Sequence, residues 1–340
     1  MIRRPLCLSA SVADTSVSRG GVRVVVADLP LRERIQGETF LIWHEGLARP
    51  AYGKWNEAQM RTAWGRHRLH RLALVDDDGR WTASIKRYRF DARYDDRRIA
   101  MLGIGAVFTP PGLRGHDAAA ELIERAIEEE RAAGTPLAAL FSEIGVAYYA
   151  RLRFEPVPLE EVTLEVTSKG GSPAMLVRSG SDADLPQLAA MHAARSSSSR
   201  FALVRTPELI QYSISKRRLL AGLGPPGRRQ TDFFVAEEGN RAAAYVVITS
   251  EERGWFIEEA GDRDPAAARL GAMLQVLIAR EPSHPVPRIR AWWPAAFPVP
   301  PQVSIVARAP APDIFMVRPL ADGLMPLRPD DVFYWRSDYF

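Results

Sequence analysis

The stretch that decides the fold runs from Ile99 to Phe154 and reads IAMLGIGAVFTPPGLRGHDAAAELIERAIEEERAAGTPLAALFSEIGVAYYARLRF. It predicts a strand over 99–109, a glycine-containing turn over 110–117, an amphipathic helix over 118–133, a strand over 136–141, and a short segment bearing Tyr148 and Tyr149. A helix entered through a glycine turn binds anions, because its first amides lack partners and carry the positive end of the helix dipole. We therefore expect a phosphate-bearing acyl carrier as the ligand.

The same stretch resembles the core of the GNAT superfamily of N-acetyltransferases. The family's pyrophosphate loop, Arg/Gln-x-x-Gly-x-Gly/Ala preceded by Val-x-x-Pro, has matching residues at Val107, Pro110, Arg114, Gly115 and Ala119. The family's Tyr-x-x-x-Gly-Phe is similar to the segment from Tyr149 to Phe154. Two family glycines are replaced, one by Asp117 and one by Arg153. The resemblance covers about residues 22–164 and is weaker in the second half.

The resemblance implies that acetyl-CoA is the cofactor. Its pantetheine arm is expected to pair with the end of the 99–109 strand, where a freed amide near Val107 would polarise the thioester carbonyl. The pyrophosphate is expected on the turn and helix start. The implied cofactor-binding residues are Val107, Phe108, Thr109, Arg114, Gly115, His116, Asp117, Ala118 and Ala119. Asp117 leaves two alternatives open: its carboxylate caps the helix amides and repels phosphate, or it points to solvent.

The resemblance also implies the catalytic residues. Tyr149 stands at the family's general-acid position, where a phenol protonates the leaving thiolate, whereas Tyr148 is expected to face the core. Glu143 could accept a proton from an amine or hold it, and helix capping by Ser142 is the alternative reading. The chain ends in Phe340, similar to enhanced-intracellular-survival acetyltransferases, in which the terminal carboxylate is the base. The alternative is an aromatic tail that packs only for stability.

Composition excludes several classes of function. Net charge is +4 with scattered basic residues, which argues against a nucleic-acid surface. No apolar run approaches the roughly 20 residues needed to span a membrane. The single cysteine, Cys7, fits a reducing compartment such as the cytoplasm. His67 and His70 have no accompanying ligand cluster, so no metal site is expected. The charge runs 86–89 and 128–130 are each predicted to form a solvated face.

The 340 residues are enough for two domains. The fold class expected is α/β, with two tandem GNAT-like mixed-sheet domains that carry helices on both faces. The predicted divisions are a flexible tail over 1–20, an acetyltransferase domain over 21–168 closed by strands within 154–166, a linker over 168–173, and a degenerate second domain over 174–340 with an aromatic C-terminal tail.

Within the second half, a hairpin around Gly239 echoes the one around Gly79 and suggests an internal duplication. A helix is predicted from Asp264-Pro265 to Arg280, with aspartate as the cap and proline at the first helical position. Residues 299–312 are predicted to be a loop. The turn 262–265 is acidic and lacks glycine pairs, so this half is not expected to bind coenzyme A.

These observations predict an N-acetyltransferase that moves an acetyl group from acetyl-CoA to an amine of a small molecule, peptide or protein. Two alternatives belong to other classes: a non-catalytic CoA-binding regulatory module, motivated by Asp117 and Arg153, and a structural protein that binds no CoA. The sequence identifies neither the acceptor, the acyl chain length nor the oligomeric state.

Overall fold

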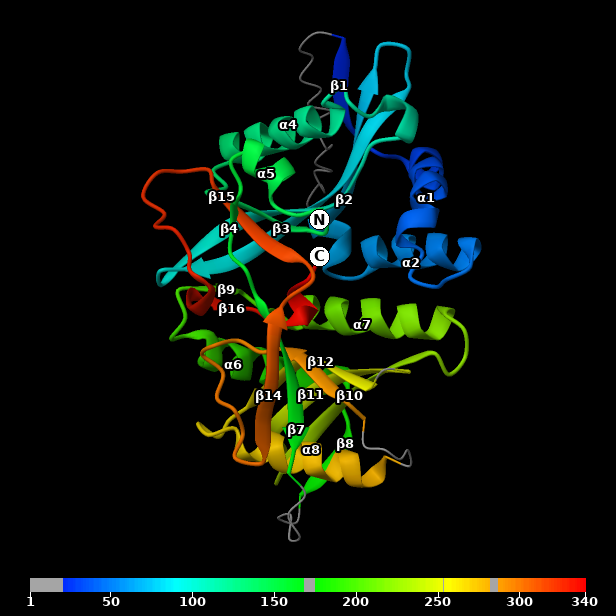
Figure 1. The fold of residues 1–340 in the computed structure, drawn as a ribbon. Helices are drawn as coiled ribbons and strands as arrows, with labels where there is room; N and C mark the ends of the chain where they lie inside the picture. The colour runs from blue at the N-terminus through cyan, green and yellow to red at the C-terminus, as the bar shows by residue number, and fades with distance from the viewer. Residues whose placement is uncertain (1–20, 168–174, 253, 282–286) are drawn as a thin grey trace, which may run out of the picture.

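The computed structural model describes residues 21–167, 175–252, 254–281 and 287–340. It contains two mixed β-sheets with helices on both faces, so the predicted α/β fold class is confirmed (Figure 1). The tail predicted over 1–20 and the linker predicted over 168–173 lie outside the described residues. Every described helix is too short or too polar to cross a membrane.

The first sheet has the strand order β1-β2-β3-β4-β5-β15-β6 and is extended by β9 and β16 beside β3. Its strands are β1 (Val22–Val26), β2 (Leu69–Asp76), β3 (Trp81–Tyr94), β4 (Arg97–Phe108), β5 (Leu137–Ser142), β6 (Glu155–Pro156), β9 (Phe201–Leu203), β15 (Ile314–Pro319) and β16 (Val332–Phe333). Its helices are α1 (Leu29–Trp43), α2 (Arg49–Arg61), α3 (Gly65–Arg68), α4 (Ala118–Ala132) and α5 (Ala147–Arg151). Strands β4 and β5 are parallel and are joined by the crossover helix α4, as the sequence predicts.

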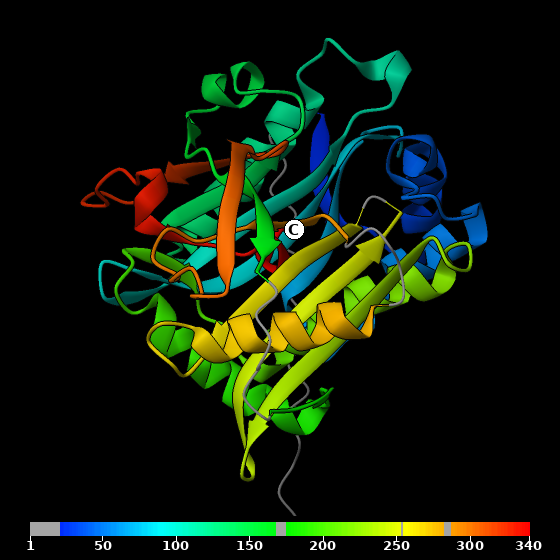
Figure 2. The same ribbon diagram turned by 60° about the horizontal axis from the view of Figure 1, so that its bottom comes forward.

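The second sheet has the order β14-β7-β13-β12-β11-β10-β8. Its strands are β7 (Glu160–Val166), β8 (Leu176–Ser179), β10 (Arg229–Glu238), β11 (Arg241–Glu251), β12 (Gly254–Asp262), β13 (Ile289–Trp292) and β14 (Val303–Pro310). Its helices are α6 (Leu185–Ser196), α7 (Pro207–Leu223) and α8 (Ala268–Arg280). Figure 2 shows α8 lying across one face of this sheet. The loop predicted over 299–312 is wrong, because β14 occupies most of it.

The two sheets exchange strands. β7 was predicted to close the first sheet, but it pairs with β13 and β14 of the second. In return, β15 comes from the second half of the sequence and lies between β5 and β6 of the first sheet. The two sheets are therefore interlaced: each half of the sequence contributes a strand to the sheet that the other half mainly forms. The division into domains at residues 168–174 falls outside the described residues and stays a prediction.

Helix α7 lies between the two sheets (Figure 1). Leu209 and Tyr212 on one side of it join the core beneath β3 and β4 of the first sheet. Ile210 and Ile214 on the other side pack on the second sheet. Because burial of apolar side chains drives folding, this helix ties both cores together. The other face of the first sheet is covered by α4.

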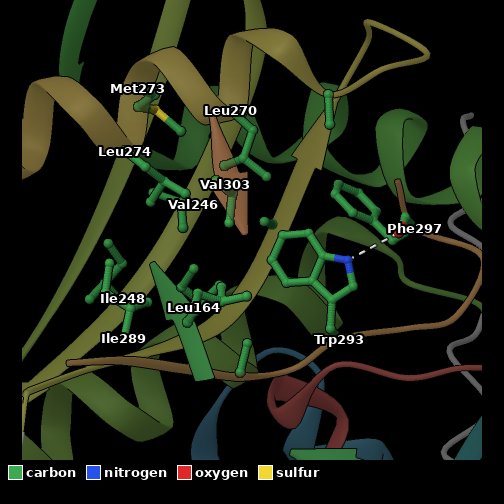
Figure 3. Close-up of a cluster of buried hydrophobic side chains, with 14 of the residues drawn as sticks. Leu164, Val246, Ile248, Leu270, Met273, Leu274, Ile289, Trp293, Phe297 and Val303 are labelled. Carbon is green, nitrogen blue, oxygen red and sulfur yellow. Dashed lines mark hydrogen bonds between the residues drawn. The ribbon is translucent and has the colours of Figure 1, made fainter. Parts of the chain in front are cut away.

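The second sheet packs on α8 through a core that includes Leu164, Val246, Leu270 and Leu274 (Figure 3). Helix α8 starts at Ala268, so the predicted start at Asp264-Pro265 is wrong. Asp264 instead folds the preceding turn, where its Oδ1 accepts from the amide of Ala266 at 2.9 Å.

Both charge runs predicted as solvated faces are partly buried. Lys86 and Arg87 on β3 are 9% and 5% exposed, and Glu130 on α4 is 3% exposed. The physical reason is that both faces of β3 are covered: α4 covers the face that carries Arg87 and Arg89, and Lys86 lies on the other face, beside Gln59 and Trp55 of α2. Arg89 donates to Glu130 at 2.6 Å and Arg87 donates to Glu129 at 2.7 Å, so these two arginines are neutralised by the glutamates of α4.

Candidate active site

Strand β4 parts from β5 and bulges against β3 at the end that precedes the glycine turn. Its pairing with β5 stops at Ile104, whereas β5 continues to Ser142. On its other side, the register with β3 shifts at Ala106, a residue with φ of 46°. A positive φ at a non-glycine residue within a strand is the signature of a bulge. The backbone around Val107 is therefore left without a β5 partner, as the sequence analysis expects.

The start of α4 presents free main-chain amides. Gly115 has φ of 85°, and a β-carbon there would meet no atom within 4 Å. The helix begins at Ala118 with no side-chain cap, so the amides of its first turn lack partners. Arg114 is exposed beside this opening, and its Nε donates to the carbonyl of Thr109 at 3.3 Å. His116 and Asp117 are also exposed, whereas Ala119 is buried under the helix.

The two replaced glycines keep a glycine-like backbone. Asp117 has φ of 53° and Arg153 has φ of 61°, both in the left-handed region. Glycine is the default there, and another residue costs roughly 1–2 kcal/mol, with aspartate among the better tolerated. The Asp117 carboxylate is exposed and does not cap the helix. Of the two alternatives for Asp117, the solvent-facing one describes this structure.

Tyr149 is a buried residue of the short helix that follows β5. It lies on α5, 6% exposed, and packs edge-to-face with Tyr148 and Phe154. Burial raises the pKa of Tyr149 well above its ordinary value, so its hydroxyl stays protonated at neutral pH. Tyr148 was expected to face the core, but it is the more exposed of the two.

Glu143 is exposed at the end of β5, and its Oε1 accepts from the hydroxyl of Tyr339 at 3.1 Å. Ser142 does not cap a helix, because its hydroxyl donates to the carbonyl of Gly145 at 2.6 Å and α5 begins later. Asp313 lies nearby. Burial and the charge of Glu143 raise the pKa of Asp313 to about 6.

Phe340 lies on the middle of β4. Its ring packs against Tyr88 and Phe90 with centroids 5.3 and 5.0 Å apart, and it stands over Gly103. Its main-chain oxygen stands over Gly105. A side chain at either glycine would collide with this residue, so both glycines make room for it.

A buried charge network holds the segment before Phe340. Arg205 donates to Asp338 and to Glu259 at 2.5 Å each, and to the hydroxyl of Ser337 at 2.7 Å. These side chains are almost completely buried, and Arg336 forms a further pair with Glu258 on β12. The second sheet thereby fixes the path of the last residues into the first sheet.

A cavity of about 170 Å³ brings the predicted catalytic residues together. Tyr149, Glu143 and Phe340 all line it, and so does Val107 at the open end of β4. The rest of its wall is largely aromatic and comes from α1, α2, β3, β5 and the last residues: Trp43, Tyr52, Trp55, Tyr88, Phe141 and Tyr339. Four charged residues that were not among the predicted site residues also line it: Glu45, Arg71, Lys86 and Lys216.

The second sheet has a similar unit, in which β12 precedes α8. Side chains fill the two places that are open in the first sheet. Helix α8 also follows a left-handed residue, Ala267 with φ of 53°, but the buried carboxylate of Asp262 accepts from the amide of Leu270 at 2.8 Å. The bulge in β12 carries the buried Glu258 in its arginine pairs. In the second sheet, carboxylates therefore lie at the two positions where the first sheet leaves main-chain groups free, namely the start of α4 and the bulge of β4.

Comparison with known proteins agrees with this geometry. Residues 42–157, about a third of the chain, match the model of the acetyltransferase (GNAT) domain. The match ends just before β7, the strand that leaves the first sheet. No curated protein matches the chain significantly.

Solved structures share the fold over most of the chain. A probable N-acyltransferase from Enterococcus faecalis is 13% identical with a TM-score of 0.65, covering 88% of this chain and 72% of its own. A GCN5-related N-acetyltransferase from Kribbella flavida is 18% identical with a TM-score of 0.64 and the same coverages. N-myristoyltransferase of Saccharomyces cerevisiae with bound myristoyl-CoA is 9% identical with a TM-score of 0.54, covering 90% of this chain and 80% of its own.

Proposed function

We propose that the protein is an acetyl-CoA-dependent N-acyltransferase with one cofactor site, in the first sheet. The observation that carries the proposal is the continuity of three features: the free amides of α4, the opened end of β4, and the cavity that contains Tyr149. The first suits a pyrophosphate, the second suits a pantetheine arm, and the third has the size for a small reacting group.

Acetyl-CoA supplies the acyl group as a thioester. The main-chain amide of Val107 would donate a hydrogen bond to the carbonyl oxygen as negative charge develops on it. The neutral amine forms a bond to the carbonyl carbon while the carbon–sulfur bond breaks. Tyr149, kept neutral by burial, gives its proton to the departing sulfur. The amine's proton passes to a carboxylate, for which Glu143 and the terminal carboxylate of Phe340 are the candidates in the cavity.

Calorimetry with acetyl-CoA tests the cofactor site. One site per chain is expected, because Asp262 occupies the helix start in the second sheet. Arg114→Glu should weaken binding sharply and should matter less for dephospho analogues. The absence of binding, or two equal sites, would contradict the proposal.

The regulatory-module alternative rested on Asp117 and Arg153. Both residues keep the backbone conformation of the glycines they replace, so neither closes the opening. This supports the enzyme over the module. Tight acetyl-CoA binding without release of free thiol on any amine would instead favour the module.

A further inference from the structure

The cavity wall contains three basic side chains without an ion-pair partner among the described residues. The carboxylates of Glu45 and Glu143 also line it, but they contact Arg229 at 3.7 Å and the hydroxyl of Tyr339 at 3.1 Å. Arg71 on β2 and Lys86 on β3 are directly opposite one another across the two strands. They are 5% and 9% exposed. Like charges in this arrangement repel one another, and burial of each charge adds a cost. Lys216 on α7 lines the same cavity.

None of these three cations has a carboxylate oxygen within 4.0 Å in the described part of the chain. Arg71 donates to the carbonyl of Ala106 at 3.2 Å, and Lys86 lies 3.4 Å from Oε1 of Gln59. Lys216 lies 3.4 Å from the carbonyl of Tyr339. Glu57, the acidic residue nearest to Lys86 on α2, is held by Arg32 in two contacts of 2.9 Å.

The other buried arginines among the described residues are ion-paired. Arg205 has carboxylates at 2.5 Å, Arg318 has Glu124 at 2.6 Å, and Arg87 has Glu129 at 2.7 Å. Removing the partner of a buried charge costs several kcal/mol, so folded proteins rarely leave one unpaired. The cavity departs from the pattern of the other buried arginines that the structure describes, and an anionic ligand would account for this difference.

The cations adjoin the proposed reaction centre. Arg71, Lys86 and Gly105 are register neighbours across β2, β3 and β4, and the main-chain oxygen of Phe340 stands over Gly105. Neighbouring strands are about 4.8 Å apart. A group bound at Lys86 is therefore only a few covalent bonds away from an amine at the end of β4.

We propose that the acceptor is a small amine that also carries an anionic group, a carboxylate or a phosphonate, held by Lys86 and Lys216 with Arg71 adding to the positive field. This inference rests on the proposed function, because it assigns the substrate class of that same site. The small volume of the cavity limits the acceptor to a compact molecule.

The pKa values agree with a site built for an anion. Burial and the charges of Arg71 and Lys216 hold the pKa of Lys86 well below its usual range. Burial and Arg217 lower the pKa of Lys216 to about 7. A bound anion would restore both ammonium groups, so binding it should be accompanied by proton uptake at pH above 7.

The test uses the whole protein with a panel of matched amines. The carboxylate arm contains ω-amino acids with one to four carbons between amine and carboxylate, and the phosphonate arm contains the corresponding aminoalkylphosphonates. The neutral arm contains the amides of the same amino acids. Thiol release from acetyl-CoA gives kcat and KM, and calorimetry on the CoA complex gives binding without turnover.

We expect one anionic arm to be preferred over the neutral arm by at least tenfold in kcat/KM. Lys86→Met and Lys216→Met should each raise KM for that arm about tenfold or more and change KM for the amides less than twofold. Lys216→Arg should recover part of the loss. Lys54→Met, an exposed lysine on α2, is the matched control and should behave as the wild type.

Three results would overturn the inference: equal use of amides and anionic amines, equal effects of the lysine variants on both, or no calorimetric binding of either anionic arm. Equal effects of the lysine variants on both arms, or no calorimetric binding of an anionic amine, would leave the lysines with a structural role only. Failure of the proposed function shows separately, as loss of acetyl-CoA binding in the absence of any acceptor.

Discussion

Gly105 and Phe340 are in such close contact that a β-carbon on the glycine would lie 3.1 Å from the main-chain oxygen of the phenylalanine. The two residues are 235 positions apart in the sequence, yet both line the cavity, one from β4 and the other from the last residue. The contact makes the position of the terminal carboxylate sensitive to one methyl group.

Gly105→Ala should therefore displace that carboxylate. A β-carbon at 3.1 Å requires the carboxylate to move by a few tenths of an ångström. Since a misplacement of about 1 Å costs up to roughly 10²-fold in rate, we expect turnover to fall by less than that, on the order of several-fold, while acetyl-CoA affinity is kept. Steady-state kinetics and calorimetry measure the two quantities. Gly222→Ala is the control, because a β-carbon there meets nothing within 4 Å. Equal turnover in both variants would show that the carboxylate's position is unimportant.

The carboxylate of Glu143 and the terminal carboxylate of Phe340 are the two candidates for the base. One variant of each distinguishes between them. Adding two glycines after Phe340 moves the terminal carboxylate but keeps the ring in its contacts with Tyr88 and Phe90. Glu143→Gln removes the other carboxylate and keeps an acceptor for the hydroxyl of Tyr339. Whichever is the base should lose about 10²–10⁴ in kcat. If both variants turn over normally at an unchanged melting temperature, neither is the base.

Tyr149→Phe removes a proton donor and keeps a buried ring. A general acid contributes about 10²–10⁴ in rate, so kcat should fall within that range with acetyl-CoA affinity preserved. Tyr148→Phe is the matched control, since the two rings are in contact but Tyr148 does not line the cavity. A loss confined to the Tyr148 variant would mean that the general acid is Tyr148.

The network around Arg205 should make a large contribution to stability. Arg205→Met leaves the buried carboxylates of Asp338 and Glu259 without their cation, which costs about 3–5 kcal/mol in the free energy of unfolding. Arg308→Met breaks a pair with Glu160 in which both side chains are more than half exposed, so it should cost at most about 1 kcal/mol. Urea unfolding of both variants measures the difference, and similar losses would contradict the expectation.

Asp313 should make stability depend on pH. The raised pKa of about 6 means that between about pH 4 and 6 the folded protein binds more protons than the unfolded chain. Its contribution to stability therefore falls as pH rises through this window. Asp313→Asn should be more stable than the wild type at pH 7.5, by on the order of 1–2 kcal/mol after allowance for partial exposure, and nearly equal at pH 4.

Unfolding by urea at the two pH values measures this difference. The exposed Asp322→Asn serves as the control for an aspartate-to-asparagine change away from the cavity. A constant difference for Asp313→Asn would rule out the proposed shift.

The unit around α4 was predicted well from residues that are close together in the sequence. The helix was expected to begin at Ala118 and does so, because a glycine turn precedes it and its apolar residues recur at helical spacing. Tyr149 and Val107 were selected from the motifs and Glu143 from its place after the second strand of the unit, and all three line one cavity. These features depend on residues that are near each other in the sequence.

The exchange of β7 and β15 could not be predicted in the same way. Periodicity indicates that a segment is a strand, but the choice of neighbour is made by tertiary packing, and β15 is far from β5 in the sequence. Lys86 is a different case. It alternates with the buried Tyr88 and Phe90 on β3, so the period of two could have indicated that it faces inward.

The interlaced sheets have a consequence for biosynthesis. β5 ends at residue 142 and its neighbour β15 begins at residue 314, so 172 positions separate them. At a synthesis rate of about 5–20 residues per second, β5 emerges on the order of ten to thirty seconds before its partner exists. During that interval its unpaired edge can join other strands and aggregate. A nascent chain of this protein should therefore need a chaperone at this stage, and synonymous codons that slow translation between the two strands should reduce its soluble yield.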